Sequence, residues 1–138
     1  MKNNYITDYL NQFSKILINY NHKDFLKIIK IVNEVKKNKK KVILVGNGGS
    51  AAMASHVCVD LTKMCKIRAV NFNEADLLTC FSNDYGYENW VQKALSFYAD
   101  KGDLLISISS SGESKNIING SKFAKRIGCK VVTLTGFN

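Results

Sequence analysis

Two polar loops rich in glycine and serine hold the residues best suited to do chemistry in this chain. The first loop is Gly46-Asn47-Gly48-Gly49-Ser50, and the second is Ser109-Ser110-Ser111-Gly112-Glu113-Ser114. Each loop follows a short apolar run and precedes a segment with helical periodicity. Backbone N–H groups and hydroxyls would therefore converge at two helix N-termini, where a phosphate dianion is stabilised. Because neither loop contains a lysine or a nucleophile–base pair, we predict a phosphorylated ligand held without a metal or ATP-type machinery.

The first loop also fits the loose dinucleotide-binding pattern, with Gly46, Gly48 and Ala51 at the required spacing. A dinucleotide site needs in addition an acidic residue at the end of the second strand, where this chain has Asn71-Phe72-Asn73. No Gly-Lys-Ser/Thr sequence follows the loop, which excludes a Walker loop. We therefore expect no nucleotide cofactor. For the second loop, a serine-rich capping turn is the alternative, and the pairing of the two loops favours ligand binding.

A histidine and an aspartate lie one turn apart in the segment after the first loop. His56 and Asp60 are at positions i and i+4, on a helix face separate from the apolar residues. Such a pair could bind a divalent metal, pass protons, or be exposed and without function, and the sequence leaves these alternatives open. Asp84, in the polar turn expected over residues 82–86 between two helices, could bond sugar hydroxyls or cap a helix.

The elements that must position these residues follow from the hydrophobic periodicity. Two amphipathic helices over residues 4–20 and 23–37 should form a hairpin. Strands are expected over residues 42–45, 68–72, 103–108 and 130–134, and helices over 50–64, 75–81, 89–99 and 114–127. Strands alternating with helices indicate an α/β domain with a doubly wound parallel sheet. In such a domain the ligand lies beyond the carboxyl ends of the strands, where both serine loops would meet.

Length and composition set the remaining limits. The 138 residues suit one domain, with a helical hairpin over 1–38 and an α/β core over 39–138. The net charge of +9 owes much to the run 36–41, which we interpret as a solvated helix end. No aromatic residue interleaves with this run, so nucleic acid is not the expected partner. Four cysteines without a CxxC pair suit reduced thiols in a cytoplasm, and no apolar stretch is long enough for a membrane span.

Taken together, five motifs resemble the sugar isomerase (SIS) domain family and, within it, the phosphoheptose isomerases. They are residues 46–52, His56, Ser82-Asn83-Asp84-Tyr85-Gly86-Tyr87-Glu88, residues 108–114, and residues 131–136. The resemblance implies a flavodoxin-like three-layer sandwich and a cytoplasmic homotetramer with a phosphorylated sugar as substrate. The implied reaction converts sedoheptulose 7-phosphate to D-glycero-D-manno-heptose 7-phosphate, for the heptose of lipopolysaccharide or capsule.

The resemblance also assigns roles to residues at matching positions. Phosphate would be held by Ser50, Ser109, Ser110, Ser111 and Ser114. Asn47, Gly48 and Gly49 would line the substrate, with Asn83 and Asp84 at the sugar. His56 and Asp60 would stand where the family has a zinc-binding histidine and a glutamate that serves as base.

The chain departs from the family pattern in two ways. Asp60 replaces the glutamate and is one methylene shorter, and a misplacement on the order of 1 Å can cost about a hundredfold in rate. The family's further glutamine and histidine lie on a C-terminal helix beyond residue 138, so we expect the chain to be incomplete at that end. A non-catalytic SIS protein, which binds a sugar phosphate or a replication initiator, is the alternative.

Overall fold

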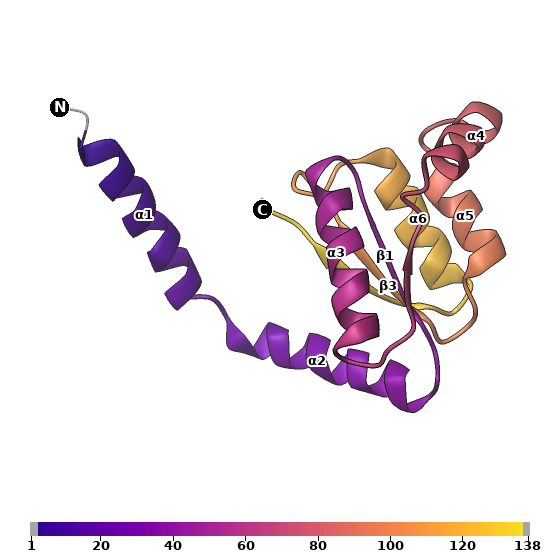
Figure 1. Ribbon diagram of the computed structural model, residues 1–138, viewed down its shortest axis with the longest axis horizontal. Helices are drawn as coiled ribbons and strands as arrows, with labels where there is room; N and C mark the ends of the chain where they lie inside the picture. The colour runs from indigo at the N-terminus through magenta and orange to yellow at the C-terminus, as the bar shows by residue number, and fades with distance from the viewer. Residues whose placement is uncertain (1–2, 137–138) are drawn as a thin grey trace. The chain divides into compact units, whose positions relative to one another are not determined.

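The computed structural model describes residues 3–136, which fall into two compact units divided between Lys30 and Ile31. The first unit contains α1 (Asn3–Ile18) and the first half of α2 (His22–Lys37) (Figure 1). Asn21 caps α2, because its side-chain oxygen accepts a hydrogen bond from Lys23 N at 3.1 Å. Both predicted helices are therefore confirmed, with the break between them at a capping residue.

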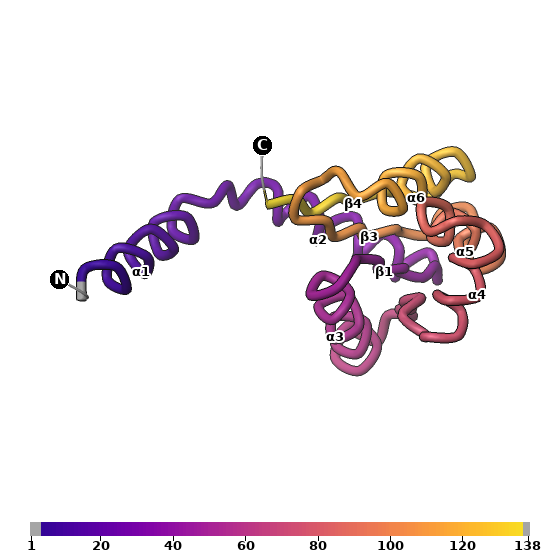
Figure 2. The backbone as a smooth tube through the Cα atoms, turned by 90° about the horizontal axis from the view of Figure 1, so that it is seen from above, coloured from indigo at the N-terminus to yellow at the C-terminus, as the bar shows by residue number. Residues whose placement is uncertain are grey.

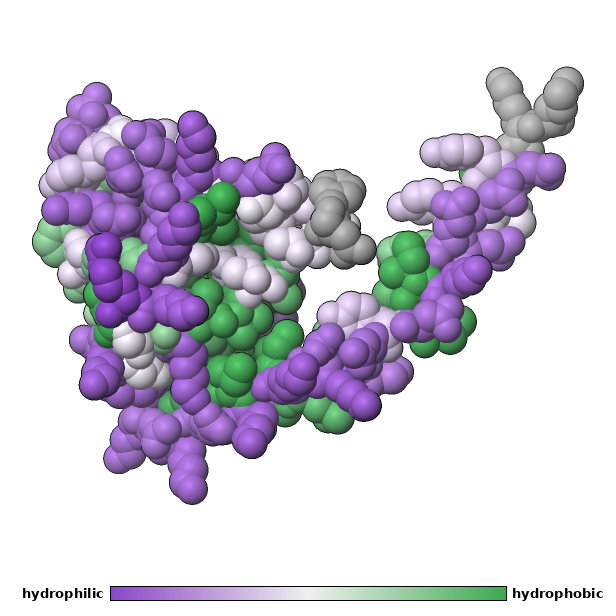
Figure 3. Space-filling model, turned by 180° about the vertical axis from the view of Figure 1, so that it is seen from behind, coloured by the Kyte–Doolittle hydropathy of each residue, from purple (hydrophilic) through white to green (hydrophobic). Residues whose placement is uncertain are grey.

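The apolar stripe predicted for the first helix is present, but it is exposed and does not form a hairpin core. Ile6, Leu10, Phe13 and Leu17 are each more than half exposed. Figure 3 shows apolar side chains of this unit at its surface. Among the described residues of the unit, Tyr20 and Phe25 make a ring contact across the break, with centroids 4.5 Å apart.

The second unit is built on a parallel sheet with the strand order β2-β1-β3-β4. The strands are β1 (Val42–Gly46), β2 (Ala69–Asn71), β3 (Leu104–Ile108) and β4 (Lys130–Leu134). The central strands β1 and β3 are apolar runs because helices cover both faces of the sheet. The predicted doubly wound α/β architecture is confirmed.

Alternate residues of the strands enter two separate cores, as the twofold period of a strand requires. Ile43 and Val45 of β1 face α5 (Trp90–Tyr98) and α6 (Lys115–Arg126), with α4 (Ala75–Tyr85) packed against α5. Val42 and Leu44 face α3 (Gly49–Lys63) and the second half of α2. Figure 2 shows these helices on opposite sides of the strands. No helix among residues 3–136 is long and apolar enough to cross a membrane.

The polar segment predicted as a turn at residues 82–86 is instead the end of α4. The helix continues through Ser82, Asn83 and Asp84 to Tyr85, and Gly86 ends it with φ +82° and a hydrogen bond from its N–H to Ser82 O. Polar residues alone do not stop a helix, whereas glycine at positive φ does. Asn83 and Asp84 are therefore helical residues.

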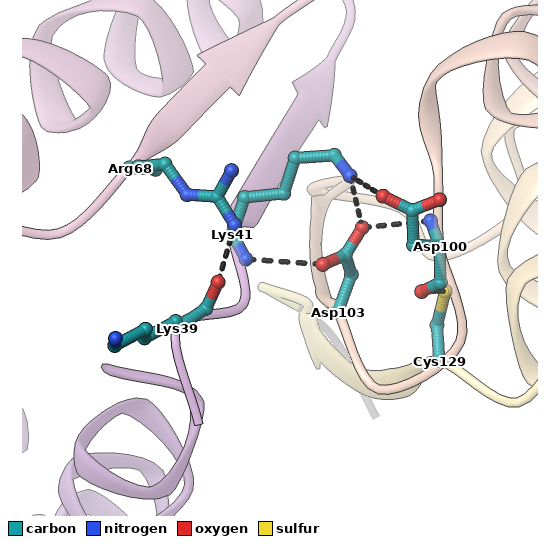
Figure 4. Close-up of polar contacts among 6 residues, drawn as sticks. All are labelled: Lys39, Lys41, Arg68, Asp100, Asp103 and Cys129. Atoms are coloured by element: carbon teal, nitrogen blue, oxygen red, sulfur yellow. Dashed lines mark hydrogen bonds and ion pairs between the residues drawn. The ribbon is translucent and has the colours of Figure 1, made fainter. Parts of the chain in front are cut away.

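A buried ion-pair network fixes the amino ends of β1 and β3 (Figure 4). Asp103 is fully buried and accepts hydrogen bonds from the backbone N–H groups of Lys41 and Asp100, at 3.0 and 2.8 Å. Lys41 Nζ lies 2.5 Å from Asp103 and 2.7 Å from Asp100. Burial lowers the pKa of Lys41, but the hydrogen bonds and charges of the two aspartates outweigh it and raise the pKa. The hydrogen bond from Lys41 lowers the pKa of Asp100.

Candidate functional site

The two serine loops leave neighbouring strands at the point where the sheet changes winding direction. Gly46 and Ile108 are paired at the carboxyl ends of β1 and β3. From β1 the chain passes through α3 to β2, and from β3 it passes through α6 to β4, on the opposite face. A crevice at such a switch point is the usual ligand site of open α/β sheets. The structure thus brings the loops together as the sequence predicts.

A reciprocal amide pair joins the first loop to the helix that follows the second. Asn47 Nδ2 donates to Asn116 Oδ1 at 3.0 Å, and Asn116 Nδ2 donates to Asn47 Oδ1 at 2.8 Å. The Tyr87 hydroxyl donates to the same Asn47 oxygen at 3.2 Å. Asn116 is buried, so both of its hydrogen bonds matter for the fold. Asn116 and Tyr87 were assigned no role from the sequence.

In the second loop the hydroxyls bond within the loop and do not cap the helix. Ser109 Oγ and Ser114 Oγ are 3.3 Å apart, and Ser111 Oγ accepts a hydrogen bond from Glu113 N at 3.2 Å. Ser114 is the N-cap residue of α6 but makes no side-chain capping hydrogen bond. Ser110 is exposed, and its carbonyl accepts a hydrogen bond from Gly136 N. Ile117 N donates to Ser114 O, so in the first turn of α6 the N–H groups of Lys115 and Asn116 remain to meet an anion.

The first loop opens α3 and borders open space. Gly48 is the N-cap with φ +52°, a conformation that a side chain would strain. A Cβ at Gly48 or Gly49 would meet no atom within 4 Å. Ser50 lies in the first turn of the helix, where its N–H donates to Asn47 O. The loop can therefore approach a ligand with its backbone.

His56 and Asp60 lie on the solvent side of α3, as expected. His56 Nε2 and Asp60 Oδ2 are 3.6 Å apart, and their side chains are 80% and 56% exposed. Within residues 3–136, no three His, Cys, Asp or Glu side chains are grouped as a metal site would require. A catalytic zinc ion needs about three protein ligands, so these residues do not form a complete zinc site.

Asn83 and Asp84 make their side-chain contacts within α4. Asn83 Nδ2 donates to Asp84 Oδ1 at 2.9 Å, and Cys80 Sγ lies 3.6 Å from Asp84 Oδ2. Both residues are exposed, and in the described part of the chain no hydrogen bond joins their side chains to either serine loop. Their predicted role at the sugar stays a prediction.

The fold and these loops are those of the SIS domain. Residues 4–136 match the family model of that domain, and the chain belongs to the SIS domain family. The chain is 43% identical over 116 residues to the phosphoheptose isomerase of Aliarcobacter butzleri, covering 80% of this chain and 61% of that protein. It is 41% identical over 109 residues to the phosphoheptose isomerase of a Nitratiruptor species, covering 75% of this chain and 58% of that one.

Solved structures agree with this assignment. A phosphoheptose isomerase from Francisella tularensis has a TM-score of 0.90 over 98% of this chain and 74% of that one, and at 24% identity it shows the shared fold. The enzyme of the same name from Neisseria gonorrhoeae has a TM-score of 0.68 at 31% identity, over 83% of this chain and 72% of that one. The chain spans about three fifths of the length of the two curated relatives above.

Proposed function

We propose that this protein is an aldose–ketose isomerase that interconverts sedoheptulose 7-phosphate and D-glycero-D-manno-heptose 7-phosphate. The observation that carries the proposal is the junction of the two serine loops at the switch point, held by the Asn47–Asn116 amide pair. Two neighbouring helix N-termini suit a phosphate monoester. The names of the curated relatives supply the sugar, because those proteins are phosphoheptose isomerases.

In this proposal the phosphate is held by neutral groups. Ser50, Ser109, Ser111 and Ser114 supply hydroxyls, with Ser110 in the same loop, and the N-termini of α3 and α6 supply amides. Asn47, Gly48 and Gly49 line the sugar, with Asn83 and Asp84 beside it. Holding the phosphate fixes the far end of the chain of carbons, so that C1 and C2 occupy one place relative to the catalytic groups.

The base in this proposal is Asp60. A base removes the proton from C1 of the ketose, an enediol forms, and the proton is returned to C2 while the hydroxyl proton moves from O1 to O2. No atom is gained or lost in the interconversion. Asp60 is reachable from solvent, and His56, 3.6 Å away on the same face, is the group proposed to relay its proton.

Zinc enters the proposal only through two side chains. His56 and Asp60 would supply two ligands, and the described residues hold no third in the same group. We therefore derive no step through a metal. A homotetramer, a cytoplasmic location and a role in making heptose for lipopolysaccharide or capsule complete the proposal, all on the strength of the family resemblance.

The second candidate function is binding of a sugar phosphate, or of a replication initiator, without turnover. The observation in its favour is the exposure of the His56–Asp60 pair, since a base in a water-filled position loses the advantage of an enclosed site.

Deuterium exchange separates the two functions. Sedoheptulose 7-phosphate is incubated with the chain in deuterated water, and NMR follows deuterium at C1 and the appearance of the aldose. Asp60→Asn should slow the exchange at least about a hundredfold, because the amide cannot accept the proton. Asp76→Asn, an exposed acid on α4, is the matched control and should exchange at the wild-type rate. Binding of the sugar phosphate without exchange in the wild type would contradict the isomerase and support the binder.

A further inference from the structure

A basic pocket lies at the amino ends of the strands, between the turn from α2 to β1 and the turn from α3 to β2. It is a cavity of about 440 Å³ lined by Lys36, Lys39, Lys40, Lys66, Ile67 and Arg68. Figure 1 shows these turns at the end of the sheet away from the serine loops. The lysine run in the sequence is therefore joined in space by two more cations from a distant turn, and is not only a solvated helix end.

The walls of this basic pocket are held in place. The Arg68 guanidinium donates to the carbonyl oxygen of Lys39 and so ties one turn to the other (Figure 4). The stem of Lys40 lies against Gly102, where an added Cβ would be 3.3 Å from Lys40 Cε. Ile67 is buried and anchors the second turn in the core. The cations are thus brought together by the fold and not by chance side-chain positions.

Two of the lysines occupy backbone positions that lysine does not favour. Lys39 has φ +54° and Lys66 has φ +55°, and they are the two non-glycine residues at positive φ in the described part of the chain. Each follows a helix end, where glycine or asparagine usually takes the left-handed conformation. Because lysine stands at both positions, the two residues that follow the helix ends also contribute two cations to the same pocket.

The protein offsets the positive charge of the pocket only in part. Lys41, the nearby lysine in Figure 4, is paired with Asp100 and Asp103. The charges of Lys40 and Arg68 also lower the pKa of Asp100, but the pocket holds five cations, which is more than this carboxylate can offset. Like charges gathered in one pocket repel one another, and a multivalent anion relieves that repulsion.

We propose that this basic pocket binds an oligophosphate, a short chain of two or more phosphates, either inorganic or as the tail of a nucleotide. Its volume suits a small molecule. No aromatic side chain is among its lining residues, so the phosphates and not a base are recognised. The five-residue strand β1 spans roughly 16 Å, so this site and the serine loops are separate.

Calorimetric titration of the full chain with inorganic tripolyphosphate at low salt tests the proposal. The double variant Lys39→Asn/Lys66→Asn removes two cations, and asparagine tolerates positive φ, so the fold should be kept. Its affinity for tripolyphosphate should fall at least about tenfold. Lys122→Gln/Lys125→Gln removes the same charge from exposed positions on α6 and should change the affinity less than about twofold.

The remaining arms identify the ligand and the site. ATP binding as tightly as tripolyphosphate assigns the phosphate chain as the recognised group, and AMP should bind at least about tenfold more weakly. Lys36→Gln/Lys40→Gln serves as a second variant if the first fails to fold. Wild-type affinity in the folded pocket variants, or equal weakening in the α6 control, would overturn the proposal. Tighter binding of a single-stranded oligonucleotide than of tripolyphosphate would overturn it in favour of nucleic acid.

Discussion

At the carboxyl ends of β1 and β3 the side chains that bond to one another are neutral hydroxyls and amides, whereas at the amino ends of the same strands they are charged. The neutral groups bond to one another across the loops, as Asn47 and Asn116 do, and leave helix amides open. The charged groups either form a buried ion pair, as Lys41 and Asp103 do, or gather as an excess of cations in the basic pocket. Under the two proposals above, one sheet would present two kinds of anion-binding surface.

The difference follows from what each end must do. Neutral hydroxyls and amides can bind and release a phosphate monoester without the cost of separating fixed charges. This property suits a site that must release its product. A buried ion pair stabilises the fold only when every partner is present, because the attraction must offset the cost of removing the charges from water. Such a pair suits a contact that holds two strands together. The comparison predicts that changes at the amino ends reduce stability most, and that changes at the carboxyl ends reduce ligand binding.

The largest effect is expected at the buried aspartate. Asp103→Ala leaves Lys41 Nζ with fewer partners and two backbone N–H groups without their acceptor. We expect a loss of about 3–5 kcal/mol in the free energy of unfolding. Urea unfolding followed by the fluorescence of Trp90, the single tryptophan and a buried one, measures it.

The matched control for this change is Lys130→Gln, which breaks the half-exposed ion pair with Glu34. It should cost less than about 1 kcal/mol, because solvent screens such a pair. Equal losses in the free energy of unfolding of the two variants would mean that burial does not make the Lys41–Asp103 pair more stabilising than the half-exposed Lys130–Glu34 pair.

A smaller effect on stability is expected at the carboxyl ends. Asn116→Ala removes both hydrogen bonds to Asn47 and should cost about 1–3 kcal/mol, measured in the same urea experiment. It should also weaken binding of sedoheptulose 7-phosphate, because the first loop loses its tie to α6. Asn119→Ala, on the same helix with one hydrogen bond to Glu88 O, should leave that binding unchanged. Wild-type binding in Asn116→Ala would show that the amide pair does not shape the site.

The sequence predicted the architecture because its signals were local. The apolar runs of β1 and β3 and the glycine and serine loops after them require no knowledge of distant contacts, and all four strands appear in the structure. The segment 82–86 was predicted wrongly, since its polar residues resemble a turn and the helix is ended only by Gly86. The first helix was predicted correctly as a helix, but periodicity does not tell what its apolar face contacts.

The arrangement of residues at the carboxyl ends of the strands was predicted in part. The serine loops could be predicted from the types and spacing of their residues. The Asn47–Asn116 pair joins residues 69 positions apart in the sequence, so it becomes visible only in the folded structure. The sequence did hold a signal for this pair. Asn116 lies next to Ile117 on the buried part of α6, and a buried asparagine side chain needs a hydrogen-bond partner. The basic pocket was missed for the same reason, since Lys66 and Arg68 are close to the lysine run only in three dimensions.

Calorimetric titration with sedoheptulose 7-phosphate tests the central claim, that the hydroxyl-lined loops bind a phosphate monoester. Ser111→Ala removes one exposed hydroxyl and should lower the affinity about tenfold or more, as the loss of a hydrogen bond to a charged group requires. Lys39→Asn/Lys66→Asn should leave this affinity unchanged, and sedoheptulose without phosphate should not bind measurably. Equal affinity of wild type and Ser111→Ala, or a loss confined to the lysine variant, would contradict the account.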